Sequence, residues 1–441
     1  MLKRFWLTAA LLACVPALYA LEGRLFFTLA PNVADEFMHI MPFRPPHIPN
    51  VTRCVRHQPV MLHLVLAKPA VGENGKVLVE IESIKSVEPD GKVKELIQPG
   101  KPLVALQGVK KKKSDFSGVM LSGLSLSMIG EDSDQLGRTR MVVKLRDRGD
   151  DSVKELAAEI ELVEKLPGVP EKPMTVEEMG KFLTGYYLSP APAKIPAAFA
   201  AFLRFDEDSV GKKNYDPLMW LCGFAELYRL NPQLRPELVK SAAKYSAVHR
   251  EYVALILAEA GAAESELKNA DSELRRLFSD IRGGGKSPLA FDRITNPAQL
   301  DALWTVFFVT GKFEPIRRLV GELRKRDGVM TPAEVKKLGR KPTGAEMKKI
   351  LPGIIGAAAE WSLASNAKQH KLVGYYLEAM LLRKQYPDLD AAVKIGGMLI
   401  KAGLMEVFDK PDGGKGLRSV LKPPRRKPAS GRGGKYDPLG K

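Results

Sequence analysis

Residues 165–173 read KLPGVPEKP, and this stretch decides how the chain is divided. It holds three prolines and one glycine in nine residues, which predicts a linker because both residue types interrupt helices and strands. Before it, apolar residues alternate or form short runs, whereas after it they recur with the period of a helix. We therefore predict a β domain at 22–165, a proline-rich linker at 166–173 and an α domain at 174–408.

The part before the linker reads as a series of short strands rich in β-branched residues. Residues 73–75 (ENG) and 89–91 (PDG) predict tight turns, because glycine supplies a positive φ and Asn or Asp tolerates one. About seven strands in some 140 residues are typical of an antiparallel sandwich. The expected strands are 25–29, 60–67, 76–87, 103–106, 117–128, 140–146 and 153–163.

One hairpin in this part carries a resemblance. Residues 136–147 (LGRTRMVVKLRD), followed by a polar turn and EIELV at 159–163, resemble the last hairpin of bacterial Ig-like domains. The resemblance covers about a third of the chain and implies an Ig-like β-sandwich.

The part after the linker has helical signals. Thr175 and Glu178 have the spacing of a capping box. Apolar residues recur at helical spacing in 300–308, Gly311 breaks the pattern, and the spacing resumes in 316–323, which predicts two paired helices. The turn TGKFE at 310–314 resembles the hairpins of tetratricopeptide-like arrays. No constant repeat length is present, so the resemblance implies an all-α, irregular helical-hairpin solenoid.

The N-terminus, residues 1–20, reads as a secretory signal peptide. Lys3 and Arg4 precede a short apolar run, and Ala20 offers a small residue for cleavage. A second route stays open, because LLAC at 11–14 resembles the bacterial lipobox, in which Cys14 is lipidated and becomes the new N-terminus. Both routes predict an exported protein of the periplasm or cell envelope. No later stretch approaches the roughly 18 apolar residues that span a bilayer.

Much of the net charge of +17 lies near the C-terminus, where residues 410–441 hold ten Lys or Arg against two Asp. The tail 409–441 is also rich in Pro and Gly, so we expect it to lack fixed structure. Such cations bind polyanions by releasing counterions. In an exported protein the partner would be phospholipid head groups, lipopolysaccharide or acidic glycans rather than nucleic acid; a solvating tail without a partner is the alternative. The candidate contacts are Lys110, Lys111, Lys112, Lys113, Arg425, Arg426 and Lys427.

The sequence offers no catalytic, metal-binding or cofactor-binding motif. RGGGKS at 282–287 ends like a phosphate-binding loop, but the pattern requires glycine where Asp280 stands. His249 lies on an apolar helical stripe and is predicted to be a packed core histidine. Arg148-Gly149-Asp150 spells an adhesion tripeptide, and a charged turn explains it as well.

Cleavage after Ala20 leaves two cysteines, Cys54 and Cys222. An oxidising compartment would permit a disulfide between them, but they belong to different predicted domains. Two unpaired thiols are therefore the default, and helical spacing places Cys222 on the accessible side of its helix.

These patterns favour a non-enzymatic binding or scaffold protein that contacts an unidentified protein or an anionic envelope polymer. The alternative is a hydrolase of an envelope polymer, with carboxylates in the groove between the two domains. Because motifs are absent, no catalytic residue is predicted.

Overall fold

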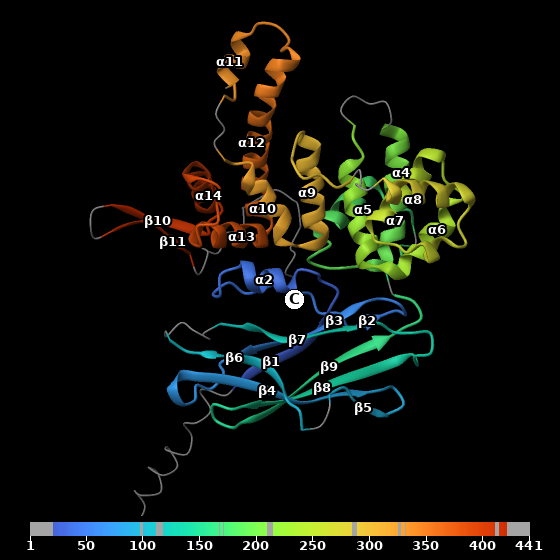
Figure 1. Ribbon diagram of the computed structural model, residues 1–441, viewed down its shortest axis with the longest axis vertical. Helices are drawn as coiled ribbons and strands as arrows, with labels where there is room; N and C mark the ends of the chain where they lie inside the picture. The colour runs from blue at the N-terminus through green and yellow to red at the C-terminus, as the bar shows by residue number, and fades with distance from the viewer. Residues whose placement is uncertain are drawn as a thin grey trace, which may run out of the picture.

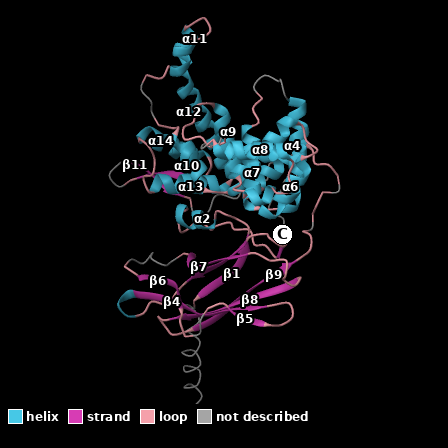
Figure 2. Ribbon diagram, turned by 45° about the vertical axis from the view of Figure 1, so that its right-hand side comes forward, coloured by secondary structure: helices cyan, strands magenta, loops and turns pink. Residues whose placement is uncertain are grey.

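The computed structural model describes most of the chain from residue 21 onward, and its helices lie on one side of its strands (Figure 1). In Figure 2 the strands form a layer of their own, with a hairpin near the C-terminus set among the helices. The described residues are 21–97, 100–111, 118–166, 168–170, 172–209, 215–284, 289–324, 328–330, 332–410 and 414–420.

The strands before the linker form two sheets. One has the order β1-β3-β7, and the other has the order β2-β9-β8-β4-β5 with β6 also paired to β4. All pairings are antiparallel except that of β2 with β9. The strands are β1 (Glu22–Thr28), β2 (Arg53–Cys54), β3 (Val60–Ala67), β4 (Lys76–Val87), β5 (Val93–Glu95), β6 (Leu103–Val109), β7 (Met120–Met128), β8 (Gly137–Asp147) and β9 (Val153–Leu162).

The two sheets enclose one core. Alternation in β8 directs Met141, Val143 and Leu145 inward and leaves the intervening residues on the outer face. They meet Leu62 and Leu64 of β3 in a single cluster of buried side chains. The prediction of β sheets in the N-terminal half, with strands near the expected positions, is thus confirmed; an Ig-like sandwich is not shown.

The chain after the linker is helical. Thr175 caps α3 through the predicted capping box with Glu178, and Gly311 ends α9 with a φ of 65°. The predicted pair of helices at 300–323 is therefore confirmed as α9 and α10. The helices are α3 (Val176–Gly185), α4 (Ile195–Ser209), α5 (Leu218–Leu230), α6 (Arg235–Ala242), α7 (Ala247–Glu259), α8 (Ser272–Gly283), α9 (Pro297–Thr310), α10 (Phe313–Gly321), α11 (Pro332–Lys337), α12 (Gly344–Gln369), α13 (Lys371–Leu382) and α14 (Leu389–Lys401).

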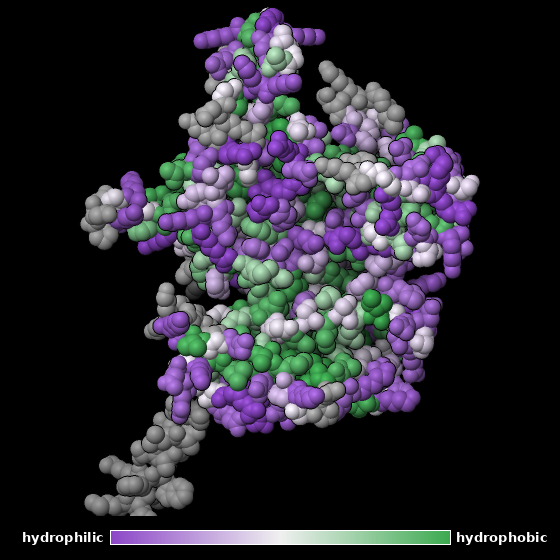
Figure 3. Space-filling model, viewed as in Figure 1, coloured by the Kyte–Doolittle hydropathy of each residue, from purple (hydrophilic) through white to green (hydrophobic). Residues whose placement is uncertain are grey.

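A segment from the predicted β domain packs on the helices instead. Helix α2 (Val33–His39) leaves the sheet after β1, and Ile40 joins the core of α9–α14. The Asp35 carboxylate accepts a hydrogen bond from the backbone N–H of Phe313 at 3.0 Å. On the other side, Phe37 lines a hollow of about 380 Å³ shared with β1 and β3. Hydrophobic residues gather on this face of the β half, whereas the helices above are mostly hydrophilic (Figure 3).

The expectation that residues 409–441 lack fixed structure is wrong for the first part of that tail. Strands β10 (Met405–Asp409) and β11 (Lys415–Ser419) form an antiparallel hairpin. The hairpin is held because Leu404 and Met405 are buried in the helical core. Residues 421–441, including Arg425, Arg426 and Lys427, lie outside the described residues.

Candidate functional site: the groove between strands and helices

A groove of about 620 Å³ lies where the two halves meet. Its first wall comes from the sheet edge formed by β2, β9 and β8, and from the segment that precedes β2. Its second wall is the turn at residues 190–193, with the sequence PAPA, which leads into α4. Leu166 of the linker lies between them. Both halves of the protein therefore build this groove.

Charged side chains on the sheet wall are set by strand register. Glu159 and Glu161 are two residues apart on β9 and therefore share its outer face. Arg138 of β8 and Arg53 of β2 both stand opposite Glu161. Arg53 Nε lies 2.9 Å from a Glu161 carboxylate oxygen. Arg140 of β8 stands opposite Glu159 in the register. Neither Arg138 nor Glu159 makes a side-chain hydrogen bond or ion pair within the described residues, so a ligand could contact both.

Gln58 adds an unused donor to the same wall. Its side chain is fully buried, and its Oε1 accepts a hydrogen bond from the backbone N–H of Val55 at 3.1 Å. Its Nε2 has no partner among the described atoms. A buried donor without an acceptor costs about 1–3 kcal/mol, so an oxygen acceptor supplied by a ligand would be favourable here.

Two further hollows border the linker. One, of about 450 Å³, shares Leu166 and Ala193 with the main groove. The other, of about 770 Å³, shares Ala191 and extends along the linker to α3. The junction of the two halves is therefore grooved along the length of the linker, as an elongated ligand would require.

The arrangement suits recognition of a polar, extended molecule. It offers a free cation, a free carboxylate and an amide donor on one wall, and small apolar residues on the other. The hydrolase alternative predicted carboxylates in this groove, and Glu159 and Glu161 lie there. Glu161 forms an ion pair with Arg53, and Glu159 has no ion-pair partner within the described residues.

A second polar cluster lies inside the helical half. His249 is buried, as predicted, and its Nε2 lies 3.1 Å from Oδ2 of buried Asp206 on α4. Tyr215 and Tyr252 both donate hydrogen bonds to Oδ1 of Asp206. Burial, and secondly the negative charge of Asp206, raise the pKa of Tyr252 to about 12. Asp206 was not predicted from the sequence. The feature that could have identified it is a carboxylate on the apolar stripe of α4, four residues after Phe202. The cluster ties α4 to α7.

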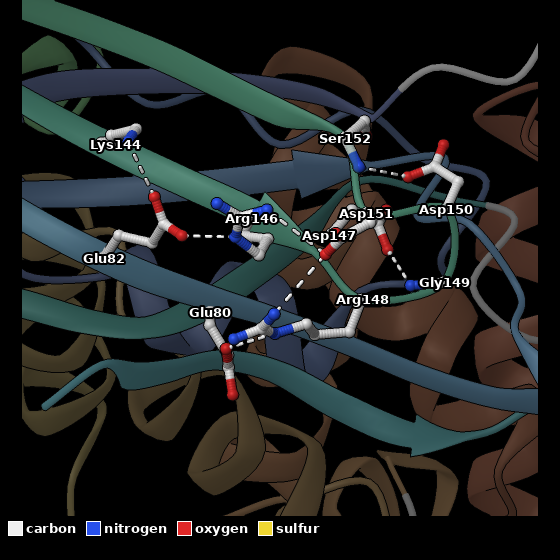
Figure 4. Close-up of polar contacts among 10 residues, drawn as sticks. All are labelled: Glu80, Glu82, Lys144, Arg146, Asp147, Arg148, Gly149, Asp150, Asp151 and Ser152. Carbon is white, nitrogen blue, oxygen red and sulfur yellow. Dashed lines mark hydrogen bonds and ion pairs between the residues drawn. The ribbon is translucent and has the colours of Figure 1, made fainter. Parts of the chain in front are cut away.

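Charged pairs also cover the outer face of the sheet (Figure 4). Arg148, the first residue of the adhesion-like tripeptide, donates a hydrogen bond to Glu80 at 2.7 Å and lies 3.5 Å from Asp151. Arg146 pairs with Glu82 and Asp151. The Arg148 side chain is thus engaged by its own sheet, which favours the charged-turn interpretation.

The other predicted contact residues lie away from the groove or outside the described residues. Lys110 and Lys111 are exposed at the end of β6 and do not line the groove. Cys14, Lys112 and Lys113 are outside the described residues, as is part of the 282–287 loop. Within the described part of the chain, no group of three or more His, Cys, Asp or Glu could hold a metal ion, and no helix has the length and hydrophobicity to cross a bilayer.

The two described cysteines are unpaired and buried, Cys54 in the sheet core and Cys222 in the helical core. The prediction of an accessible Cys222 is wrong, because α5 packs against α7 and α9 and leaves little of its surface exposed. Burial raises the pKa of Cys54 to about 11 and that of Cys222 to about 12.

We expect both thiols to resist alkylation in the folded protein, because reaction requires an exposed thiolate. Labelling of Cys54 and Cys222 with iodoacetamide near neutral pH should be slow without denaturant and fast with it. Mass spectrometry would count the modified thiols. Rapid labelling of Cys222 in the folded state would contradict the burial described above.

Comparisons with known proteins assign the chain to no family. No protein-family model matches it, and no curated protein does. Among solved structures, a family 123 glycoside hydrolase from Clostridium perfringens, studied for glycolipid glycan hydrolysis, aligns with a TM-score of 0.17 and 8% identity. The alignment covers 43% of this chain and 36% of that chain. So low a score carries no argument about fold or function.

Proposed function

We propose that this chain is an exported binding protein of the bacterial periplasm or cell envelope that holds an extended, polar partner in the groove between its two halves. One observation carries the proposal: both halves build the groove, and its lining includes Arg138, Glu159 and Gln58, whose buried Nε2 has no partner among the described atoms. In this proposal the β part is an Ig-like sandwich and the α part an irregular solenoid, two scaffolds that commonly present binding surfaces.

A fixed groove supports such a role. Arg44, from the segment after α2, forms a buried ion pair with Glu378 of α13 and so joins the strand-bearing half to the helices. Because this pair restrains the two halves that supply the walls, less conformational entropy is lost when a ligand enters.

The groove is tested by retention of partners from envelope extract. Mature protein should retain a protein or polymer, and the charge-exchanged variant Arg138→Glu/Glu159→Lys should lose most of it. The intact mass of the same preparation identifies its N-terminus, and so separates cleavage after Ala20 from lipidation at Cys14.

The control keeps net charge and exposure but lies away from the groove. Arg276 and Asp280 form an exposed pair on α8, and Arg276→Glu/Asp280→Lys should retain the partner as the unchanged protein does. Equal retention by both double variants would overturn the groove proposal. If a retained polymer were instead shortened, and Glu159→Gln stopped the shortening, the hydrolase alternative would replace it.

A further inference from the structure

Helix α12 has a second row of apolar residues, which the described structure leaves partly exposed. Its buried side, which includes Ile355, Ala359 and Leu363, packs into the core shared with α9, α10, α13 and α14. Met347, Ile354 and Trp361 follow one another at seven-residue intervals, so they form a stripe along another side of the helix. They are 40%, 46% and 74% exposed. An exposed Trp at the end of such a stripe is unusual for a surface with no partner.

Helix α14, a neighbour of α12, also carries exposed apolar residues. Lys394 of α14 lies 3.6 Å from Glu360 of α12, which places the two helices side by side. On α14, Leu389 and Val393 are 76% and 75% exposed and lie opposite the buried Ile395 and Leu399. Both helices therefore direct their exposed apolar residues away from the core that they share.

The surroundings of the stripe are basic. Helices α11 and α12 project beyond the rest of the helical half (Figure 1), and hydrophilic residues cover much of their tip (Figure 3). Three carboxylates of α12 and α14 are paired: Glu346 with Arg340, and Glu360 and Asp390 with Lys394. Glu334 of α11 also has an interaction within the protein. Exposed lysines without an ion-pair partner in the described structure remain at Lys336, Lys337, Lys341, Lys348 and Lys349.

From this combination we infer that the surface of α11, α12 and α14 binds the face of an anionic phospholipid membrane. Lysines attract acidic head groups, and partly inserted Met, Ile, Leu, Val and Trp side chains bury apolar area at the head-group boundary, where Trp is favoured. A second copy of the chain is a poorer occupant, because pairing the same surface would bring the two sets of lysines together. The contact is peripheral and separate from the groove.

The test is co-sedimentation of the full mature chain with vesicles. We expect binding to vesicles of phosphatidylglycerol and phosphatidylcholine and little binding to phosphatidylcholine alone. The variant with all five lysines replaced by Gln should bind the anionic vesicles at least about tenfold more weakly, because each lysine near such a surface strengthens binding several-fold. On binding, tryptophan emission should shift to the blue, and Trp361→Phe should remove that shift.

Two controls separate this surface from other causes. The first control replaces three exposed lysines of the same half, Lys240→Gln/Lys244→Gln/Lys268→Gln. The second replaces an exposed apolar residue of α7, Val248→Ser. Each control variant should bind the vesicles like the unchanged chain. Deletion of residues 421–441 removes the basic tail, and the five-lysine effect should persist without it. Absence of binding, binding that depends only on the tail, equal loss in both lysine variants, or dimerisation through Trp361 would each overturn the inference. None of these outcomes changes the groove.

Discussion

Replacing Glu378 with alanine should lower the free energy of unfolding by about 3–5 kcal/mol, because it leaves the buried Arg44 guanidinium without its counter-charge. Arg44 Nε and Nη2 donate to the two Glu378 carboxylate oxygens at 2.7 and 2.8 Å. Both side chains are almost completely buried. The bidentate geometry makes the ion pair strong, and burial makes the loss of one partner costly in stability.

The remaining contacts of Arg44 would not compensate. Its Nη1 donates to the carbonyl of Val420 at 3.0 Å, and its guanidinium lies 5.1 Å from the centre of the Tyr375 ring. These contacts connect the N-terminal segment to the helices and to the end of the C-terminal hairpin, but they carry no negative charge. Loss of Glu378 should therefore loosen the junction on which the groove depends.

Urea unfolding followed by circular dichroism measures this effect, and Glu406→Ala is the control. Glu406 pairs with Arg418 at 2.7 Å on the exposed hairpin, so its loss should cost less than about 1 kcal/mol. The apolar double variant Arg44→Met/Glu378→Leu should recover much of the lost stability, because it leaves no buried charge. Equal effects of Glu378→Ala and Glu406→Ala would contradict the account.

The strands and the paired helices could be predicted from sequence because their signals are local. Alternation in residues 140–146 and the proline-rich linker each depend on a few neighbouring residues. The junction could not be predicted, since Arg44 and Glu378 are 334 positions apart. The available signal was indirect: Glu378 is the sole charged residue in 372–382, LVGYYLEAMLL, and a lone carboxylate in an apolar helix requires a partner.

The candidate site follows the same division. The period of β9 shows that Glu159 and Glu161 share a face. The register places an arginine opposite each of them, and only the side-chain geometry shows that Glu161 forms the ion pair, with Arg53. The PAPA turn has no feature in sequence that marks it as the opposite wall. Helix α2 was missed because its seven residues are too few for a clear helical period.

The second large effect concerns pH and Glu36 of α2, at the same junction. Relative to the unchanged protein, Glu36→Gln should gain about 2–3 kcal/mol of stability as the pH rises from about 5 to about 8. Burial raises the pKa of Glu36 from 4.5 to about 7, although hydrogen bonds from Asn32 Nδ2 and the His47 N–H, both at 2.7 Å, act in the opposite direction. Between these two pKa values the native state holds a proton that the unfolded state has released, so stability falls as the pH rises.

The effect of Glu36 is seen in the difference in stability between the two proteins at each pH, and not in the pH dependence of the unchanged protein alone. His370, close by at 3.2 Å from the Tyr187 hydroxyl, has its pKa lowered by burial from 6.5 to about 4. Between those values the unfolded state binds more protons, so His370 makes stability rise with pH and masks the effect of Glu36. Both proteins contain His370, so its contribution cancels in their difference. Urea unfolding at several pH values gives the difference in the free energy of unfolding between the two proteins. If that difference stayed constant, Glu36 would be ionised in the folded protein throughout this pH range, and the junction would accommodate a buried charge.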